Sequence, residues 1–197
     1  ILHHPYENDG VDFWWMDWQQ GTDYWWIHEA NKDGVLQDER EVLDPLWMLN
    51  HLHILDISRT GRRPMFFSRY SGIGSQRYPV GFSGDTTITW DSLDFQPYFT
   101  ATASNVGYGW WSHDIGGHFY GVKDDELYLR SVQYAVFSPI LRLHSCDDEM
   151  MSKEPWNYRN GIGELAIKAL KYRHSLIPFI YSLAYKCFAE GDCLVEP

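Results

Sequence analysis

The chain has 197 residues, which is enough for one domain with a sizeable hydrophobic core. Its 16 basic and 27 acidic residues give a formal net charge of −11. This balance argues against nucleic acids and anionic membranes as partners, because phosphate binding needs Lys and Arg gathered on one face. No apolar run reaches transmembrane length. The three cysteines favour a reducing, cytoplasmic compartment over a disulfide framework, and a secreted location stays open.

The predicted elements alternate between strands and helices. In chain order they are a strand at 11–18, a helix at 44–61, a strand at 63–69, a helix at 91–105, a strand at 107–114, a helix at 124–137, a strand at 139–144, a long helix at 161–190 and a strand from 193. We expect Pro178 to kink the long helix. This alternation predicts an α/β fold with a parallel sheet, either an open doubly wound sheet or part of an eight-stranded barrel.

Four of the predicted strands end in a polar side chain, at Asp17, Arg69, Asp114 and His144. In parallel α/β folds the chemistry lies just beyond the carboxyl ends of the strands. The sequence therefore predicts that these four side chains gather at one rim.

Asp17 stands among Trp and Phe residues, and Asp85 follows a glycine in "FSGDTTITW". Taken singly, Asp17 could be an aspartate satisfied by backbone amides, and Asp85 could cap a helix. Taken together they suit the hydrolysis of a sugar acetal, which needs one carboxyl at the anomeric carbon and another to protonate the leaving oxygen.

Two other motifs are weaker. Gly72 and Gly74 begin like a dinucleotide-binding loop, but the third glycine is replaced by Arg77. The stretch "HDIGGH" offers potential metal ligands in His113, Asp114 and His118, yet its spacing suits a strand end and a turn better than a metal site. We therefore expect neither a nucleotide nor a metal, and no cofactor.

Several segments, in order, resemble glycoside hydrolase family 31, the retaining α-glucosidase and α-xylosidase group. "FWWMDWQQG" is similar to the family's nucleophile strand, and "SRYSGIGSQRYPVGFSGDTTITW" to the segment that joins a sugar-binding arginine to the acid/base aspartate. "GWWSHDIGGH", "FSPILRLHS" and "KEPWNY" also resemble family motifs. Two departures stand out: the family often has Trp where Phe82 stands and an aromatic residue where His118 stands.

The resemblance implies a role for each matching residue. Asp17 would be the nucleophile and Asp85 the acid/base. Arg69 and His144 would hydrogen-bond the hydroxyls of the bound sugar, and Asp114 would orient that network or contact the sugar itself. The expected walls of the pocket are Trp15, Trp18 and Phe82. An oligosaccharide or other α-glycoside would be the substrate, with no metal and no cofactor.

The resemblance also implies that residues 1–197 are a segment of a single (β/α)8 catalytic domain, roughly strand four to the start of strand eight, which would not close or be active alone. The expected activity is that of an α-glucosidase acting on terminal α-linked glucose. An α-xylosidase, an α-galactosidase, a transglycosylase or a non-catalytic carbohydrate-binding fragment remain alternatives.

Overall fold

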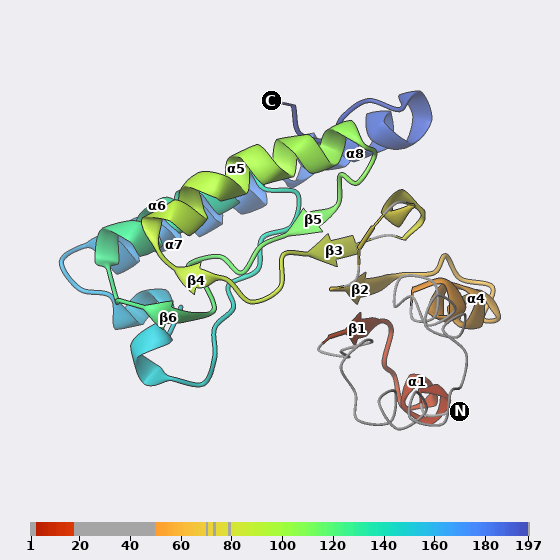
Figure 1. Ribbon diagram of the computed structural model, residues 1–197, viewed down its shortest axis with the longest axis horizontal. Coiled ribbons are helices and arrows are strands. Elements are labelled where there is room, and N and C mark those ends of the chain that lie inside the picture. Colours follow the sequence, from red (N-terminus) through yellow and green to blue (C-terminus); the bar gives the residue numbers. More distant parts are fainter. Residues whose placement is uncertain (1–2, 18–49, 70, 73, 79, 197) are drawn as a thin grey trace, which may run out of the picture. The chain divides into compact units, whose positions relative to one another are not determined.

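A computed structural model describes residues 3–17, 50–69, 71–72, 74–78 and 80–196 (Figure 1). The chain divides into two compact units, Ile1–Gly81 and Phe82–Pro197. No helix among the described residues is long and apolar enough to span a bilayer.

The first unit carries parallel strands covered by short helices. Its elements are α1 (His4–Asn8), β1 (Trp14–Met16), α4 (Leu52–Ser58), β2 (Phe66–Ser68), the 3-10 helix η2 (Ser75–Arg77) and the first two residues of β3 (Val80–Phe82). Strand β2 pairs in parallel with both β1 and β3, with Trp14 opposite Phe66 and Phe67 opposite Val80. The parallel arrangement predicted for the strands at 11–18 and 63–69 is therefore confirmed.

A small aromatic core holds this unit together. Met16, Ile57, Phe66 and Tyr78 form a buried cluster against which Trp14 packs. The predicted helix at 44–61 is described only from residue 50 onward, where α4 accounts for it. Gly61 has a φ of +72° and lies just beyond the end of α4, as expected for a glycine that follows a helix.

The second unit is built mainly from helices. Its elements are β4 (Thr87–Ile88), α5 (Trp90–Asn105), β5 (Trp111–Ser112), β6 (Phe119–Gly121), α6 (Asp125–Ala135), the 3-10 helices η3 (Glu149–Met151) and η4 (Pro155–Asn157), α7 (Ile162–Ser175) and α8 (Ile177–Glu190). Strands β4 and β6 pair in parallel. The predicted strand at 139–144 is reduced to two parallel bridges, Ser112 with Ile140 and Ile115 with Leu143.

Helices α6 and α7 enclose the main core of the second unit (Figure 1). Ile115, Val132, Ala135 and Ala166 are among its most deeply buried members. Helix α6 accounts for the predicted helix at 124–137, and Asp124 caps it, because its carboxylate accepts hydrogen bonds from the backbone amides of Glu126 and Leu127. Within the described residues neither unit closes a barrel by itself.

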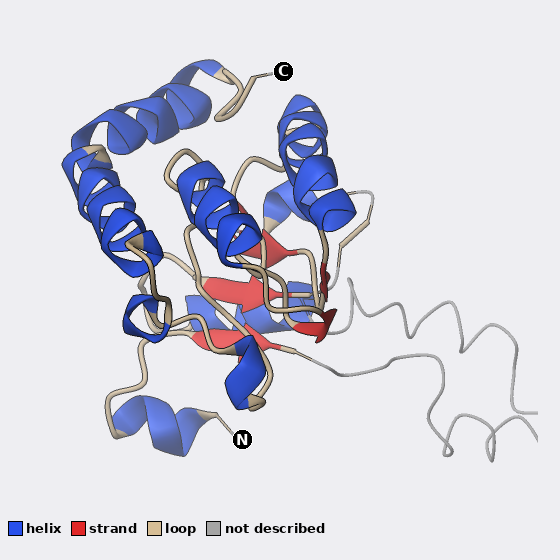
Figure 2. Ribbon diagram, turned by 90° about the vertical axis from the view of Figure 1, so that its left-hand side faces the viewer, coloured by secondary structure: helices blue, strands red, loops and turns tan. Residues whose placement is uncertain are grey.

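Three details of the predicted elements were wrong. Residues 161–190 form two helices, because the chain turns at Leu176, and Pro178 lies in the first turn of α8, where its missing N–H is tolerated (Figure 2). Residues 193–195 form no strand; instead the Val195 amide donates to Ser104 Oγ. Strands β3 and β4 fall between the predicted strand at 63–69 and the predicted helix at 91–105, where no strand was predicted.

Candidate active site

Asp17 and Arg69 form an ion pair at the carboxyl ends of β1 and β2. Because Met16 lies opposite Ser68 in the parallel pair, the next residue of each strand emerges at the same edge. The Arg69 amide donates to the Met16 carbonyl, and Arg69 Nε donates to Asp17 Oδ1 at 2.6 Å. Both side chains are about a quarter exposed, at 31% for Asp17 and 22% for Arg69. The result is a solvent-accessible carboxylate held by a charged donor.

Trp15 lies on the same side of β1 as Asp17, because side chains alternate along a strand. Its indole is 41% exposed and its ring centroid lies 5.3 Å from that of Phe67 on β2. Trp14 and Met16 point instead to the core of the first unit. Trp15 therefore lies outside the buried cluster of the first unit and packs against Phe67. Trp18, the other predicted wall, lies outside the described residues.

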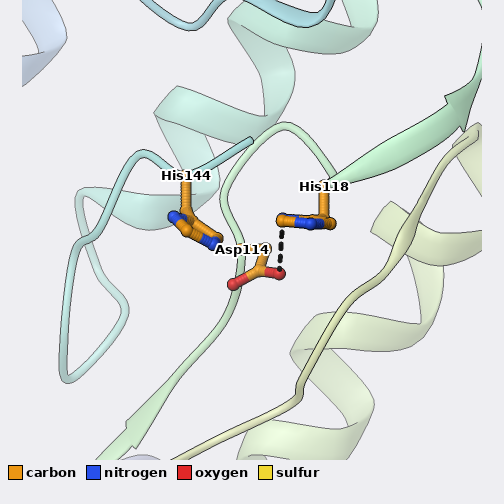
Figure 3. Close-up of side chains that lie close together, drawn as sticks. All are labelled: Asp114, His118 and His144. Atoms are coloured by element: carbon orange, nitrogen blue, oxygen red, sulfur yellow. Dashed lines mark ion pairs between the residues drawn. The ribbon is translucent and has the colours of Figure 1, made fainter. Parts of the chain in front are cut away.

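A double-glycine turn follows β5 in the second unit. Gly116 and Gly117 have φ values of +90° and +81°, and the Gly117 amide donates to the Asp114 carbonyl at 2.8 Å. A Cβ on Gly117 would lie 2.8 Å from the Cα of Ile88, so the turn also needs glycine for space. The turn carries His118 back over Asp114, with Nδ1 3.8 Å from Asp114 Oδ2 (Figure 3).

Asp114 is fully buried, at 0% exposure of its side chain, and it is paired with an arginine. Arg142 Nη2 donates to Asp114 Oδ1. Burial raises the pKa of Asp114 to about 6, and the nearby Arg142 charge acts in the opposite direction. At neutral pH the carboxyl is therefore ionised and bound to Arg142. Sequence reasoning missed Arg142; its signal was a basic residue inside the apolar run that leads to His144.

The backbone of His118 is fixed on both sides. Its amide donates to the Thr86 carbonyl at 2.7 Å, and its carbonyl accepts from the Cys146 amide at 3.0 Å. Its Nε2 consequently lies 3.8 Å from Asp85 Oδ1, and its ring stacks on His144 with a centroid distance of 4.8 Å and an interplanar angle of 28°. The second unit thus brings together Asp85, Asp114 and His144, three of the predicted site residues, around His118. The sequence analysis had named His118 only as an unlikely metal ligand.

The remaining candidates have different surroundings. Phe82 is only 2% exposed, and the Arg142 guanidinium lies over its ring at 5.1 Å. His113, which adjoins Asp114 in sequence, is buried with its Nε2 2.8 Å from Thr100 Oγ1, and burial lowers its pKa to about 4. The two histidines of "HDIGGH" therefore do not act together. Asp85 does not cap α5; Thr89 does, by accepting from the Ser92 amide.

Comparison with known families identifies the class to which this site belongs. Residues 2–183 match the family model described as the glycosyl hydrolases family 31 TIM-barrel domain. The chain therefore belongs to glycosyl hydrolase family 31, and the resemblance seen in its motifs is confirmed.

Individual relatives agree with this assignment. The chain is 31% identical to an alpha-xylosidase of Saccharolobus solfataricus over 95% of this chain and 27% of that protein. It is 32% identical to human neutral alpha-glucosidase AB over 68% of this chain and 14% of that protein. Among solved structures, the cycloalternan-degrading enzyme from Trueperella pyogenes aligns with a TM-score of 0.65 at 27% identity, over 71% of this chain and 21% of that one. The chain thus spans about a quarter or less of these relatives.

Proposed function

We propose that the protein is a retaining α-glycosidase in which Asp17 is the nucleophile and Asp85 the acid/base. The observation that carries the proposal is the Asp17–Arg69 pair, which sits at the carboxyl ends of two parallel strands in a chain of family 31. We further propose that residues 1–197 belong to a single (β/α)8 catalytic domain.

The reaction proceeds in two displacements. In the first, an Asp17 oxygen forms a bond to the anomeric carbon while the glycosidic bond breaks, and Asp85 gives its proton to the leaving oxygen. In the second, Asp85 takes a proton from water, whose oxygen attacks the anomeric carbon and releases Asp17. The mechanism requires the two carboxyls to lie about 5–5.5 Å apart.

The neighbours of the two aspartates fit these roles. Arg69 supplies a charged donor that holds the carboxylate of the proposed nucleophile in place. Two further polar side chains, Asp114 and His144, lie close to His118, which in turn lies 3.8 Å from Asp85. Asp114 is held by Arg142, and both side chains can bind sugar hydroxyls. Trp15 offers a flat apolar face for the sugar ring. Trp18 is a further proposed substrate contact. Phe82, only 2% exposed with the Arg142 guanidinium over its ring, is proposed to support the pocket wall.

The proposed substrate is a terminal α-linked glucose of an oligosaccharide. The relatives named above include both an alpha-xylosidase and an alpha-glucosidase, so α-xyloside hydrolysis is the second candidate. α-Galactoside hydrolysis, transglycosylation and binding without catalysis are further alternatives. A panel of aryl α-glycosides in the full-length protein distinguishes the sugars, and analysis of the products distinguishes water from a sugar as the acceptor.

Two substitutions test the assignment. Asp17→Asn should lose turnover by a factor of roughly 10³ or more, because it removes the nucleophile, and a mechanism-based fluorosugar should label Asp17 in the wild type. Asp85→Ala should retain more activity on substrates with good leaving groups, which need little protonation. Asp9→Asn and Asp94→Asn, both at exposed positions, serve as matched controls and should keep wild-type rates. Normal turnover in Asp17→Asn, or a label on another residue, would refute the proposal.

A further inference from the structure

Three atoms of the kind that bind metals meet in the second unit. A carboxylate oxygen of Asp114 and one ring nitrogen each from His118 and His144 all lie within 4.8 Å of one another (Figure 3). They come from the end of β5, from the double-glycine turn and from the segment after Leu143.

Two of these residues contribute buried polar atoms that have no hydrogen-bond partner among the described residues. These atoms are Asp114 Oδ2 and His118 Nδ1, which face each other at 3.8 Å. Leaving a buried acceptor on a carboxylate unsatisfied costs about 1–3 kcal/mol, and such groups are rare in folded proteins. The pair therefore needs a third partner, and a cation between the two atoms would satisfy both.

The local backbone holds the cluster in place before any ligand arrives. His118 is fixed through hydrogen bonds to Thr86 and Cys146, and a Cβ on Gly117 would collide with Ile88, so the turn is confined. Asp114 is held through its other oxygen by Arg142, which leaves Oδ2 directed at the histidines. Leu143, which precedes His144, is bridged to Ile115. Backbone contacts thus position His118 and the residue before His144, and an ion pair positions Asp114.

The donor set selects the type of ion. Two imidazoles and one carboxylate suit Zn²⁺ and neighbouring transition metals, whereas Mg²⁺ and Ca²⁺ prefer oxygen ligands alone. Ligand atoms of a tetrahedral zinc site lie roughly 3.3 Å apart, given Zn–N bonds of about 2.0–2.1 Å. The donors must therefore close in by about an ångström, which rotation of the two imidazoles can supply. The positive charge of Arg142 lowers the affinity of the site for a cation. The negative charge of Asp85, 3.8 Å from His118, raises that affinity.

We propose that Asp114, His118 and His144 form a binding site for one divalent transition-metal ion, such as Zn²⁺, and that the bound ion excludes the sugar. The second part rests on the proposed function, because Asp114 and His144 are proposed sugar contacts. The first part is independent of it. His118 is the deciding residue, since it stands where the family often has an aromatic side chain that cannot bind a metal.

Metal binding is tested directly with the full-length, metal-stripped protein. Titration with Co²⁺, followed by its visible ligand-field absorption, and calorimetry with Zn²⁺ should show one site per chain. His118→Phe should weaken binding about tenfold or more, because loss of one ligand costs at least as much as loss of a supporting residue. The matched substitution His174→Phe, at an exposed position on α7, should leave binding unchanged. Binding that is equal in the wild type and His118→Phe would overturn the site.

A second variant protects the test against misfolding. His118→Asn keeps a polar side chain but replaces imidazole with a poor zinc ligand, so it should also lose the Co²⁺ absorption while circular dichroism stays that of the wild type. Retention of the absorption in this folded variant would exclude His118 as a ligand.

Competition with the sugar is tested by kinetics on an aryl α-glycoside. Zn²⁺ should raise the apparent KM of the wild type with kcat unchanged, EDTA should reverse the effect, and His118→Phe should be insensitive. Zinc that binds at the site without changing KM would overturn the exclusion of sugar. A protein that binds zinc as described but hydrolyses no glycoside would refute the proposed function and leave the metal site standing.

Discussion

The ion pair between Arg142 and Asp114 provides a sharp test of the electrostatics of the second unit. In Arg142→Met the Asp114 carboxyl loses its charged donor while its side chain remains at 0% exposure. Breaking a buried pair by removing one partner costs about 3–5 kcal/mol. The same substitution at Arg130, whose pair with Glu126 is more than half exposed on both sides, should cost less than about 1 kcal/mol.

The stability lost in Arg142→Met should increase as the pH rises. In the wild type the pKa of Asp114 is raised from about 3.9 unfolded to about 6 folded, so the folded state holds more protons between these values. The contribution of Asp114 to the free energy of unfolding therefore falls as the pH rises from about 4 to about 6, and is constant above that. Arg142 lowers this pKa, so Arg142→Met moves it above 6 and extends the fall to higher pH, at about 1.4 kcal/mol per pH unit.

Denaturant unfolding of the full-length protein from pH 5 to pH 8.5 measures this effect. Arg142→Met should be more destabilised at pH 8 than at pH 5.5, and the double variant Asp114→Asn/Arg142→Met should recover much of the loss and show no such trend. A destabilisation of Arg142→Met that is the same at both pH values, and not relieved by Asp114→Asn, would show that Arg142 acts by packing against Phe82 rather than through charge.

Two further predictions concern helix starts. Gly163→Ala should destabilise the protein by roughly 2 kcal/mol or more, because the added Cβ would lie 2.1 Å from the Pro155 carbonyl oxygen; an unchanged melting temperature would contradict this contact. Asp124→Ala should cost about 1 kcal/mol in the same assay through loss of the α6 cap, and Asp124→Asn should recover most of it, since an amide oxygen can still accept from the Leu127 amide.

Local sequence signals predicted the elements that depend on local chemistry. The helices at 91–105 and 124–137 were both predicted from residues a few positions apart, and both are present. Local sequence signals did not predict the strands that form only by pairing with residues distant in the chain. Strands β3 and β4 are each two or three residues long, and only their partners, β2 and β6, make them strands.

The candidate site divides in the same way. The sequence by itself determined the family, and it placed Asp17, Arg69, Asp114 and His144 at the ends of predicted strands, because each of these polar residues follows an apolar run in the chain. Only the tertiary structure decided that Arg142 neutralises Asp114 and that His118, rather than His113, joins Asp114 and His144. The physical reason is that the chain sends neighbouring side chains to opposite sides, so that His113 is buried and Asp114 faces the double-glycine turn. The backbone of His118 donates to Thr86 and accepts from Cys146, and these two hydrogen bonds place its ring beside Asp114 and His144.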